Sequence, residues 1–254
     1  MAAYVPSPPI CDKIISMIRL DRFLCEMNEG TRSEVKKLIS KGLVEVNGET
    51  VSDPGKKVDP DKDCIFVGGR HIAYAEFEYF MLNKPAGVIS ASRADLRSKA
   101  EICVVDLISD KKRKDLFPIG RLDKDTEGLL LITNDGRLAH DLLSPKKHVD
   151  KQYLAELDIP LTEEGRKRIE EGVDIGDDKP TLPCRISFNS KNSILITIHE
   201  GRFHQIKRML LTEGCTVTYL KRLSMGSLRL DPELKKGESR RLTGEELSML
   251  RSGK

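Results

Sequence analysis

The side chains with the clearest chemical potential gather in one stretch, residues 120–136. It begins with a polar loop in which Arg121, Asp123 and Asp125 lie close together, and it continues directly into the apolar segment 128–133. A run of this kind predicts a buried strand, so the loop would hold a carboxylate rigidly at the edge of a core beside an arginine. A buried carboxylate stays ionised only where a cation offsets its desolvation. The charge pattern alone also fits a salt-bridged structural loop.

Three shorter blocks carry other side chains that could take part in chemistry. They are residues 83–87 (Asn-Lys-Pro-Ala-Gly), 151–153 (Lys-Gln-Tyr) and 200–209 (Glu-Gly-Arg-Phe-His-Gln-Ile-Lys-Arg-Met). Taken alone, Tyr153 fits a core aromatic residue better than a catalytic one. The five histidines lack metal-ligand spacing, the six cysteines form no C-x-x-C pair, and there is no glycine-rich phosphate loop. These patterns argue against a structural zinc site, a disulfide framework and a nucleotide cofactor.

The composition is that of a globular protein on the polar side, since 39% of the 254 residues are apolar and 33% are charged. The length allows one large domain, or a small domain followed by a medium one. No apolar run approaches the roughly 18 residues that would span a bilayer. The N-terminus also lacks the pattern of a secretory signal. We therefore expect a cytoplasmic protein with no membrane partner.

The net charge of +3 is too small to indicate nucleic-acid binding by itself. Binding to a nucleic acid would therefore depend on local clusters of cations, which are what matter for phosphate contacts. Candidate clusters lie at Lys111–Lys114, at Lys146, Lys147 and Lys151, and at Lys221-Arg222. Each of them also fits an ordinary solvated surface.

The spacing of apolar and turn residues divides the chain into two domains. We expect residues 1–16 to be a disordered leader, or an artefact that precedes a natural start at Met17. Residues 17–70 are expected to form a small domain, residues 71–76 a linker, and residues 77–254 a larger domain.

The small domain is predicted to combine two helices with short strands. An amphipathic helix begins at Ile18, and a second helix begins with a capping box in which Thr31 and Glu34 satisfy free backbone amides. Asn47-Gly48 joins two strands in a tight hairpin, and residues 64–67 form another strand.

The larger domain is predicted to mix strands and helices without a regular β-α-β order. Strands are expected at residues 80–82, 128–133, 193–199 and 216–220, and helices at residues 137–143, 163–171, 203–211 and 245–251. This mixture favours an α+β fold with a mainly antiparallel central sheet and flanking helices.

Cations gather on one side of the second helix of the small domain. Arg32, Lys36 and Lys37 lie near one face, opposite the apolar side of the helix. A helix start with several cations on one side suits phosphate binding, because backbone amides and side chains point the same way. By charge alone, a solvated helix face is the better interpretation.

Both domains resemble parts of known families. Residues 18–67, with T-R-S-E-V-K-K-L-I and then G-L-V-E-V-N-G, resemble the small RNA-binding module named after ribosomal protein S-four. Residues 120–136, G-R-L-D-K-D-T-E-G-L-L-L-I-T-N-D-G, resemble the long signature of the RsuA-type pseudouridine synthases. The three shorter blocks described above resemble further motifs of that family in the same order. The resemblance covers nearly everything from Ile18 to Leu250.

This resemblance implies an enzyme that converts uridine to pseudouridine in ribosomal RNA without a redox cofactor, a nucleotide or a metal. Asp123 would be the catalytic carboxylate and Lys207 the cation that offsets its desolvation. Tyr153 would lie flat against the pyrimidine, with a hydroxyl able to move a proton. Arg208 would point about a quarter-turn away from Lys207. Attack of Asp123 on the sugar, attack on the base and removal of a sugar proton all stay open.

The target base must leave its stack, at a cost of a few kcal/mol that phosphate contacts could offset. The resemblance and the position beside the motifs nominate these RNA contacts: Arg32, Lys36, Lys37, Arg121 and Arg202. His204 is expected to support the site or to contact RNA.

The expected substrate is small-subunit (16S) ribosomal RNA, because Ser144-Pro145-Lys146-Lys147-His148 is closer to the small-subunit enzyme than to its large-subunit relatives. The same reaction on large-subunit (23S) RNA is one alternative. Another is a non-catalytic RNA-binding or ribosome-assembly factor, which the intact set of Asp123, Tyr153 and Lys207 disfavours. The expected partner is ribosomal RNA, free or in an assembly intermediate, and the protein is expected to be a monomer.

Overall fold

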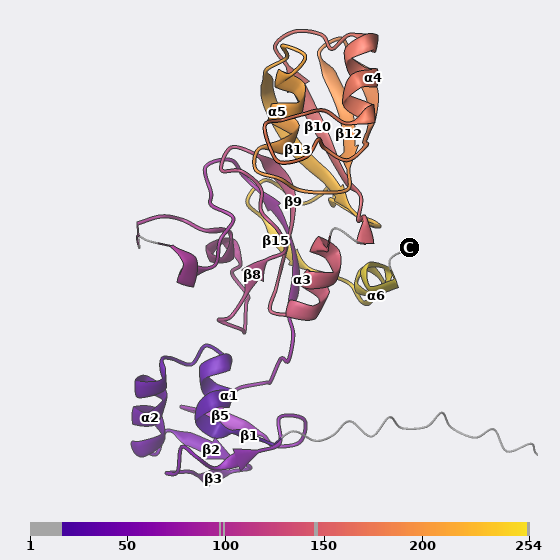
Figure 1. Cartoon of the computed structure of the whole chain (residues 1–254). Helices are drawn as coiled ribbons and strands as arrows, with labels where there is room; N and C mark the ends of the chain where they lie inside the picture. Colours follow the sequence, from indigo (N-terminus) through magenta and orange to yellow (C-terminus); the bar gives the residue numbers. More distant parts are fainter. Residues whose placement is uncertain (1–16, 97, 99, 145–146, 253–254) are drawn as a thin grey trace, which may run out of the picture. The chain divides into compact units, whose positions relative to one another are not determined.

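The computed structural model describes residues 17–96, 98, 100–144 and 147–252. The chain divides into two units, residues 1–76 and residues 77–254 (Figure 1). Each unit contains its own hydrophobic core. The leader expected at residues 1–16 lies outside the described residues. None of the helices in the described ranges has the length and apolar character needed to cross a bilayer.

The first unit packs two helices against short strands. Its elements are β1 (Ile18–Arg19), α1 (Leu20–Glu26), α2 (Arg32–Ser40), β2 (Val44–Val46), β3 (Glu49–Thr50), β4 (Lys57–Val58), β5 (Ile65–Val67) and β6 (Arg70–His71). The order β3-β2-β5-β6 forms one sheet, and β1 pairs separately with β4. Val35 and Ile39 of α2 are buried against Phe23 of α1 and the strands, which leaves the opposite face of α2 to water.

The ends of α2 follow from its sequence. The Thr31 hydroxyl accepts a hydrogen bond from the Glu34 amide at 3.4 Å, and the Glu34 carboxylate accepts one from the Thr31 amide at 2.8 Å. These two bonds complete the predicted capping box. Gly42, just beyond the helix, has a φ of +70°, a left-handed conformation that glycine adopts without steric cost. The first helix differs from expectation, because Ile18 lies in β1 and α1 begins at Leu20.

Residues 71–76, expected to be a linker, instead pack into the first unit. His71 pairs with Phe66 as part of β6, and Ile72 is only 6% exposed. The ring of Tyr74 lies 5.2 Å from that of Phe23, measured between centroids. Burial of these apolar side chains explains why this segment folds with the preceding strands rather than remaining a free connection.

The second unit is built on a nine-stranded sheet with the order β11-β12-β10-β13-β9-β7-β15, in which β14 also pairs with β13 and β8 with β9. Its strands are β7 (Tyr79–Lys84), β8 (Phe117–Pro118), β9 (Glu127–Thr133), β10 (Lys151–Leu157), β11 (Arg185–Ser190), β12 (Ser193–Ile198), β13 (Val217–Met225), β14 (Leu228–Arg229) and β15 (Ser239–Arg241). Its helices are η1 (Arg93–Asp95), η2 (Val104–Leu107), α3 (Gly136–Leu143), α4 (Glu163–Glu171), α5 (Gln205–Leu211) and α6 (Gly244–Ser252). Among the described strand pairs of this sheet, all are antiparallel except β13 with β9. The predicted α+β class with a mainly antiparallel sheet is confirmed.

The sheet has a hydrophobic core on each face, because its interior strand β9 is apolar on both sides. All seven residues of β9 are buried. Leu130 and Ile132 point into one core, and Leu129 and Leu131 point into the other, as the two-residue period of a strand requires. Figure 1 shows α4 and α5 beside β10, β12 and β13, and α3 near β9. The strand predicted at residues 128–133 is therefore confirmed as a fully buried interior strand of the sheet.

Some strands are not revealed by the sequence pattern. Neither β10 nor β11 has a continuous apolar run, and β13 continues to Met225, beyond the end expected at Leu220. In β10 the buried Tyr153, Ala155 and Leu157 alternate with more exposed residues, so the strand is recognisable only once one of its faces is known to be covered.

The parallel contact between β9 and β13 requires glycine at position 128. Gly128 has a φ of +99° and pairs with Arg222. A Cβ atom at this position would lie 2.2 Å from the carbonyl oxygen of Arg222, so any side chain would push the two strands apart. Because β9 begins directly after the loop that contains Asp123, this close approach fixes where the loop ends.

We expect Gly128→Ala to lower the free energy of unfolding by more than about 3 kcal/mol, because the added methyl group meets backbone and the residue must keep a positive φ. Thermal unfolding of the purified variants measures this change. Gly136→Ala is the matched control, since a Cβ there has no heavy atom within 4 Å. Equal unfolding midpoints for Gly128→Ala and the unsubstituted protein would contradict the close approach.

Candidate active site

A small pocket opens where the loop before β9 meets α5, β10 and β13. Its volume is about 70 Å³, and its lining includes Asp123, Tyr153, His204 and Lys207. These side chains come from the loop, from β10 and from the start of α5, which are far apart in the sequence. The structure thus brings together the three residues that the sequence nominated for catalysis.

Asp123 lies in a tight turn with buried neighbours. The Thr126 amide donates a hydrogen bond to the Asp123 carbonyl at 3.1 Å. The backbone of Leu122 exchanges two hydrogen bonds with the hydroxyl of Ser90, at 3.1 and 2.8 Å. Leu122 and Thr126 are buried, whereas the side chain of Asp123 is 26% exposed. The carboxylate is therefore held at the edge of the core, and it keeps contact with solvent.

Lys84 anchors this turn from inside the protein. Its side chain is fully buried, and its ammonium nitrogen shares its three N–H donors among the carbonyl oxygens of Pro85 (3.0 Å), Asp123 (3.1 Å), Lys124 (3.2 Å) and Thr126 (2.9 Å). Burial lowers the pKa of Lys84 to about 8, although carboxylates of the same loop oppose the shift. The lysine of the 83–87 block thus sets the path of the backbone that carries Asp123.

A single ammonium group serves two carboxylates beside the pocket. Lys207 donates to both oxygens of Asp125, at 2.7 and 2.8 Å, and lies 3.4 Å from Oδ2 of Asp123. The hydrogen bond from Lys207 lowers the pKa of Asp125. Nε2 of His204 lies 3.7 Å from Oδ1 of Asp123. Arg208 points away, as expected, and pairs with a carboxylate elsewhere. Lys207 is therefore a cation next to Asp123, with shorter contacts to Asp125.

Tyr153 contributes an apolar wall to the pocket. It is 7% exposed and stands in β10 opposite Ile196 of β12 and Arg222 of β13. Ile198 and Leu220 also line the pocket. An aromatic ring among aliphatic side chains provides a flat apolar surface suited to a planar base. Within the described ranges, no cluster of three or more His, Cys, Asp or Glu side chains is arranged to hold a metal ion.

The two arginines beside the motifs differ in how their guanidinium groups are used. Arg121 lines the pocket and is exposed. Arg202 donates to the Glu200 carboxylate at 2.9 Å and to the carbonyl oxygens of Lys179 and Pro180 at 2.6 and 2.8 Å. Arg202 therefore stabilises the loop before α5, whereas Arg121 is presented to solvent.

Three side chains from the cation clusters considered for phosphate contacts are buried inside the protein. Arg113, Lys151 and Arg222 are only 5%, 6% and 2% exposed. The guanidinium of Arg222 donates to the carbonyl oxygen of Leu129 at 2.7 Å, and burial lowers the pKa of Lys151 to about 8. These three side chains stabilise the sheet and its surroundings and do not offer a phosphate contact. Lys146 lies outside the described residues.

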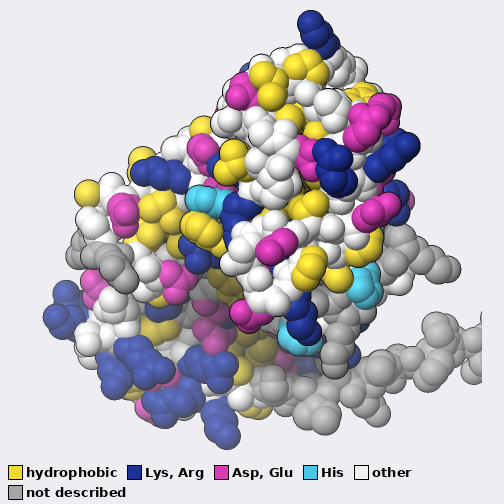
Figure 2. Space-filling model, turned by 45° about the horizontal axis from the view of Figure 1, so that its top comes forward, with side chains coloured by type: hydrophobic (Ala, Val, Ile, Leu, Met, Phe, Trp, Pro, Cys, Tyr) yellow, Lys and Arg dark blue, Asp and Glu magenta, His cyan; other side chains and the backbone are white. Residues whose placement is uncertain are grey.

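The cations of α2 remain at the surface. Arg32, Lys36 and Lys37 are exposed, while Val35 and Ile39 on the other side of the helix are fully buried. Figure 2 shows lysine and arginine side chains gathered on one face of the first unit. This face is available to an anionic partner such as an RNA backbone.

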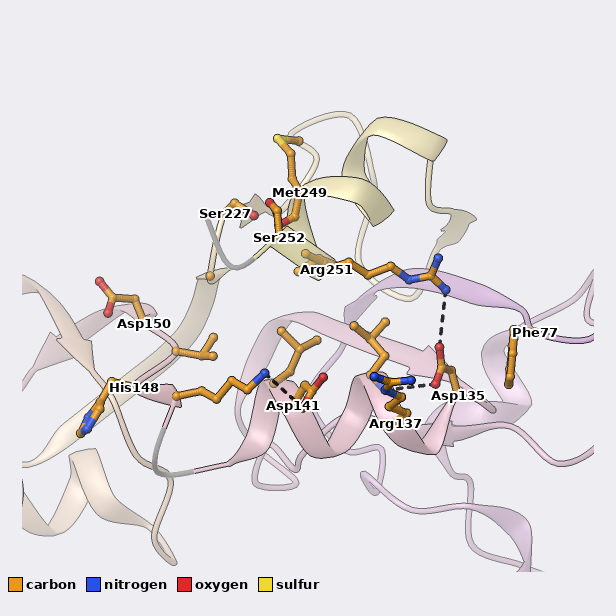
Figure 3. Close-up of a pocket in the computed structure, with 16 residues that line it drawn as sticks. Phe77, Asp135, Arg137, Asp141, His148, Asp150, Ser227, Met249, Arg251 and Ser252 are labelled. Carbon is orange, nitrogen blue, oxygen red and sulfur yellow. Dashed lines mark hydrogen bonds and ion pairs between the residues drawn. The ribbon is translucent and has the colours of Figure 1, made fainter. Parts of the chain in front are cut away.

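A wider cavity of about 970 Å³ lies between α3, α6 and residues 147–150 (Figure 3). Its charged side chains pair with one another, since Arg251 lies 3.6 Å from Asp135 and Lys147 lies 3.2 Å from Asp141. None of the nominated catalytic residues lines it. The residues that the sequence nominated for catalysis therefore line the smaller pocket around Asp123.

Both units match known families. Residues 18–64 match the S4 domain, and residues 78–212 match the family described as RNA pseudouridylate synthase. The second match defines the catalytic unit as that of an enzyme that isomerises uridine in RNA. The chain belongs to the RNA pseudouridylate synthase family, which confirms the family and the fold class indicated by the sequence motifs.

The relatives cover nearly the whole chain. An uncharacterized RNA pseudouridine synthase, YtzG, of Bacillus subtilis is 46% identical over 92% of this chain and 98% of its own length. Ribosomal small subunit pseudouridine synthase A of Vibrio vulnificus is 37% identical over 91% and 98%. Ribosomal large subunit pseudouridine synthase B of Bacillus subtilis is 38% identical over 93% and 96%. A crystal structure of a pseudouridylate synthase superposes with a TM-score of 0.64 at 34% identity, over 92% of this chain and 99% of the other.

We expect Lys84→Met to destabilise the second unit by about 3 kcal/mol and to lower kcat/KM by about 100-fold, because carbonyl oxygens of the Asp123 turn lose their buried donor. Thermal unfolding and pseudouridine formation measure the two effects. Lys191→Met, which alters an exposed lysine of the same unit, should change neither quantity. Full activity in Lys84→Met would show that the turn keeps its shape without the ammonium group.

Proposed function

We propose that the protein converts a specific uridine of small-subunit ribosomal RNA to pseudouridine, with Asp123 as the essential carboxylate. The observation that carries this proposal is the pocket in which Asp123, Tyr153 and Lys207 meet. The names of the relatives support ribosomal RNA as the substrate, and they include both small-subunit and large-subunit enzymes at similar identity. The preference for the small subunit rests on the resemblance of residues 144–148.

The reaction moves the base from a nitrogen to a carbon linkage without adding an atom. The bond between N1 of the base and C1′ of the sugar breaks, and a bond between C5 and C1′ forms. The hydrogen on C5 leaves as a proton, and N1 gains one. Because substrate and product are isomers, the reaction consumes no reductant, oxidant or nucleotide.

The pocket residues have distinct roles in this scheme. Asp123 acts as an ionised carboxylate, and the ammonium group of Lys207 at 3.4 Å stabilises negative charge there. Tyr153 lies against the pyrimidine ring, and its hydroxyl serves the proton transfer from C5 to N1. Three first steps are chemically open to Asp123: attack on the sugar, attack on the base, and removal of a sugar proton.

The two units divide the work between binding and chemistry. Arg32, Lys36 and Lys37 of the first unit hold the RNA backbone, and Arg121 adds a phosphate contact at the pocket. The protein acts as a monomer in the cytoplasm, on free ribosomal RNA or on an assembly intermediate.

We expect the purified protein to form one new pseudouridine in unmodified small-subunit RNA and none in large-subunit RNA, as detected by chemical mapping. Asp123→Ala should abolish the product and leave the Kd for RNA within a few fold, because only the reacting group is removed. Asp178→Ala, at an exposed carboxylate, is the matched control and should be fully active.

Other outcomes of this experiment point to the alternatives. A new site only in large-subunit RNA would reassign the substrate. Turnover by Asp123→Ala would overturn the role of this carboxylate. If neither RNA is modified, an assembly intermediate should be tested next, and its failure would favour a binding factor without activity.

We expect Lys36→Ala combined with Lys37→Ala to weaken RNA binding and to reduce the slope of log Kd against log salt by about 1.5. Each phosphate contact releases counterions from the RNA, so binding with two fewer contacts releases fewer of them. Binding is measured between low and moderate salt. Lys191→Ala combined with Lys235→Ala removes two exposed lysines of the second unit and serves as the control for net charge. An unchanged slope in the α2 variant would mean that these lysines form only a solvated face.

A further inference from the structure

Phe203 is an exposed aromatic ring next to His204, which lines the catalytic pocket. Its side chain is 74% exposed, the highest value among the exposed large hydrophobic residues of the described ranges. Its ring is stacked on that of His204, with 3.8 Å between the centroids and 19° between the planes. His204 lines the pocket and lies 3.7 Å from Asp123. The ring of Phe203 therefore has one face covered by His204, and His204 in turn lies beside Asp123.

The loop that presents Phe203 is held by side-chain hydrogen bonds. The side-chain amide of Gln205 donates to Glu200 at 2.9 Å and accepts from the backbone amide of Arg202 at 3.0 Å. Arg208 donates to the carbonyl oxygen of Phe203 at 3.1 Å. Because the backbone of the loop is held and the ring is stacked on His204, Phe203 loses less conformational freedom when it binds a partner than it would on a free loop.

The backbone next to the ring has an unusual conformation. His204 has a φ of +48°, in the left-handed region that few residues other than glycine adopt. Residues kept in such conformations cluster at functional sites. Here the conformation accompanies the stacking of the imidazole on the phenyl ring, beside Asp123.

The reaction leaves nucleobases that could stack on such a ring. A target uridine in the pocket has left its stack, so the nucleotides on both sides of it lose a stacking neighbour. These nucleotides are covalently attached to the target and must pass the mouth of the pocket. Aromatic side chains stack on any of the bases, because each base has a π face.

We propose that Phe203 stacks on the nucleobase adjacent to the target uridine and replaces a contact that this base loses when the uridine is extruded. The proposal rests on the proposed function, since it requires an RNA uridine in the Asp123 pocket. His204 supports the ring from its covered face. Phe203 therefore recognises the presence of a neighbouring base and does not select its identity, because the ring offers no hydrogen bond.

The first test compares Phe203→Ala, Phe203→Leu and Phe203→Tyr in the full chain. Dissociation constants for unmodified ribosomal RNA and single-turnover rates are measured. The alanine and leucine variants should bind about 5-fold to about 150-fold more weakly, and the tyrosine variant should retain the affinity. Leu211→Ala removes a 61% exposed apolar side chain from α5, the helix that follows the Phe203 loop, and should leave the Kd unchanged.

A second measurement identifies the stacking partner. An RNA fragment containing the mapped uridine is prepared with an abasic nucleotide on its 5′ or its 3′ side. On the side where the ring stacks, the abasic nucleotide should weaken binding to the unsubstituted protein by the same factor as Phe203→Ala. Phe203→Ala should cause no further loss of affinity for the RNA that carries this abasic nucleotide. Additive losses on both sides would overturn the stacking contact.

The remaining outcomes separate this proposal from the one on which it rests. An unchanged Kd in Phe203→Ala, or full affinity in Phe203→Leu, would overturn stacking, the latter in favour of a simple apolar contact. The unfolding midpoint should be equal in all variants, because the ring is exposed. If the unsubstituted protein forms no pseudouridine in free RNA or in an assembly intermediate, the proposed function fails, and the stacking proposal fails with it. If pseudouridine forms but the Kd of Phe203→Ala is unchanged, the stacking proposal alone fails.

Discussion

Lys84 places a positive charge inside the protein, and the backbone near it is arranged around that charge. An isolated ammonium group would be too costly to remove from water, so the turn at residues 123–126 directs its carbonyl oxygens toward it. Hydrogen bonds from a charged donor are stronger than those between neutral groups. The turn is therefore fixed through its backbone, and the side chain of Asp123 is left free to line the pocket. A carboxylate can be held in place in this way without being buried itself.

The charges at the pocket form a shared arrangement rather than isolated pairs. Lys207 contacts the exposed Asp125 more closely than Asp123. As a result, the ammonium group of Lys207 is hydrogen-bonded to the solvent-exposed carboxylate of Asp125. The carboxylate of Asp123 has this cation nearby but forms no tight hydrogen bond with it. Asp123 therefore keeps its oxygen atoms available to a substrate while it remains beside a positive charge.

The sequence predicts those features that depend on neighbouring residues. The capping box at Thr31 and the buried strand β9 are encoded by a few adjacent side chains, and the motif around Asp123 was sufficient to indicate the family. The sequence does not reveal that Lys84 and Arg222 are buried, because a charged residue type suggests a surface position. Their partners are backbone oxygens from other segments, which only the folded sheet brings near. For the same reason β10 is not recognisable before its covered face is known.

The pairing of β7 with β15 bears on how the protein is made. Phe80 pairs with Arg241 and Leu82 with Ser239, so the strand that ends in Lys84 is joined to a strand that follows much later in the sequence. Synthesis proceeds from the N-terminus, and the first unit has a core of its own that does not await these residues. Contacts between such distant segments form slowly, and until β15 emerges one edge of β7 exposes unpaired backbone groups that can associate with other chains. During synthesis, the RNA-binding unit can thus fold well before β15 completes the sheet of the catalytic unit.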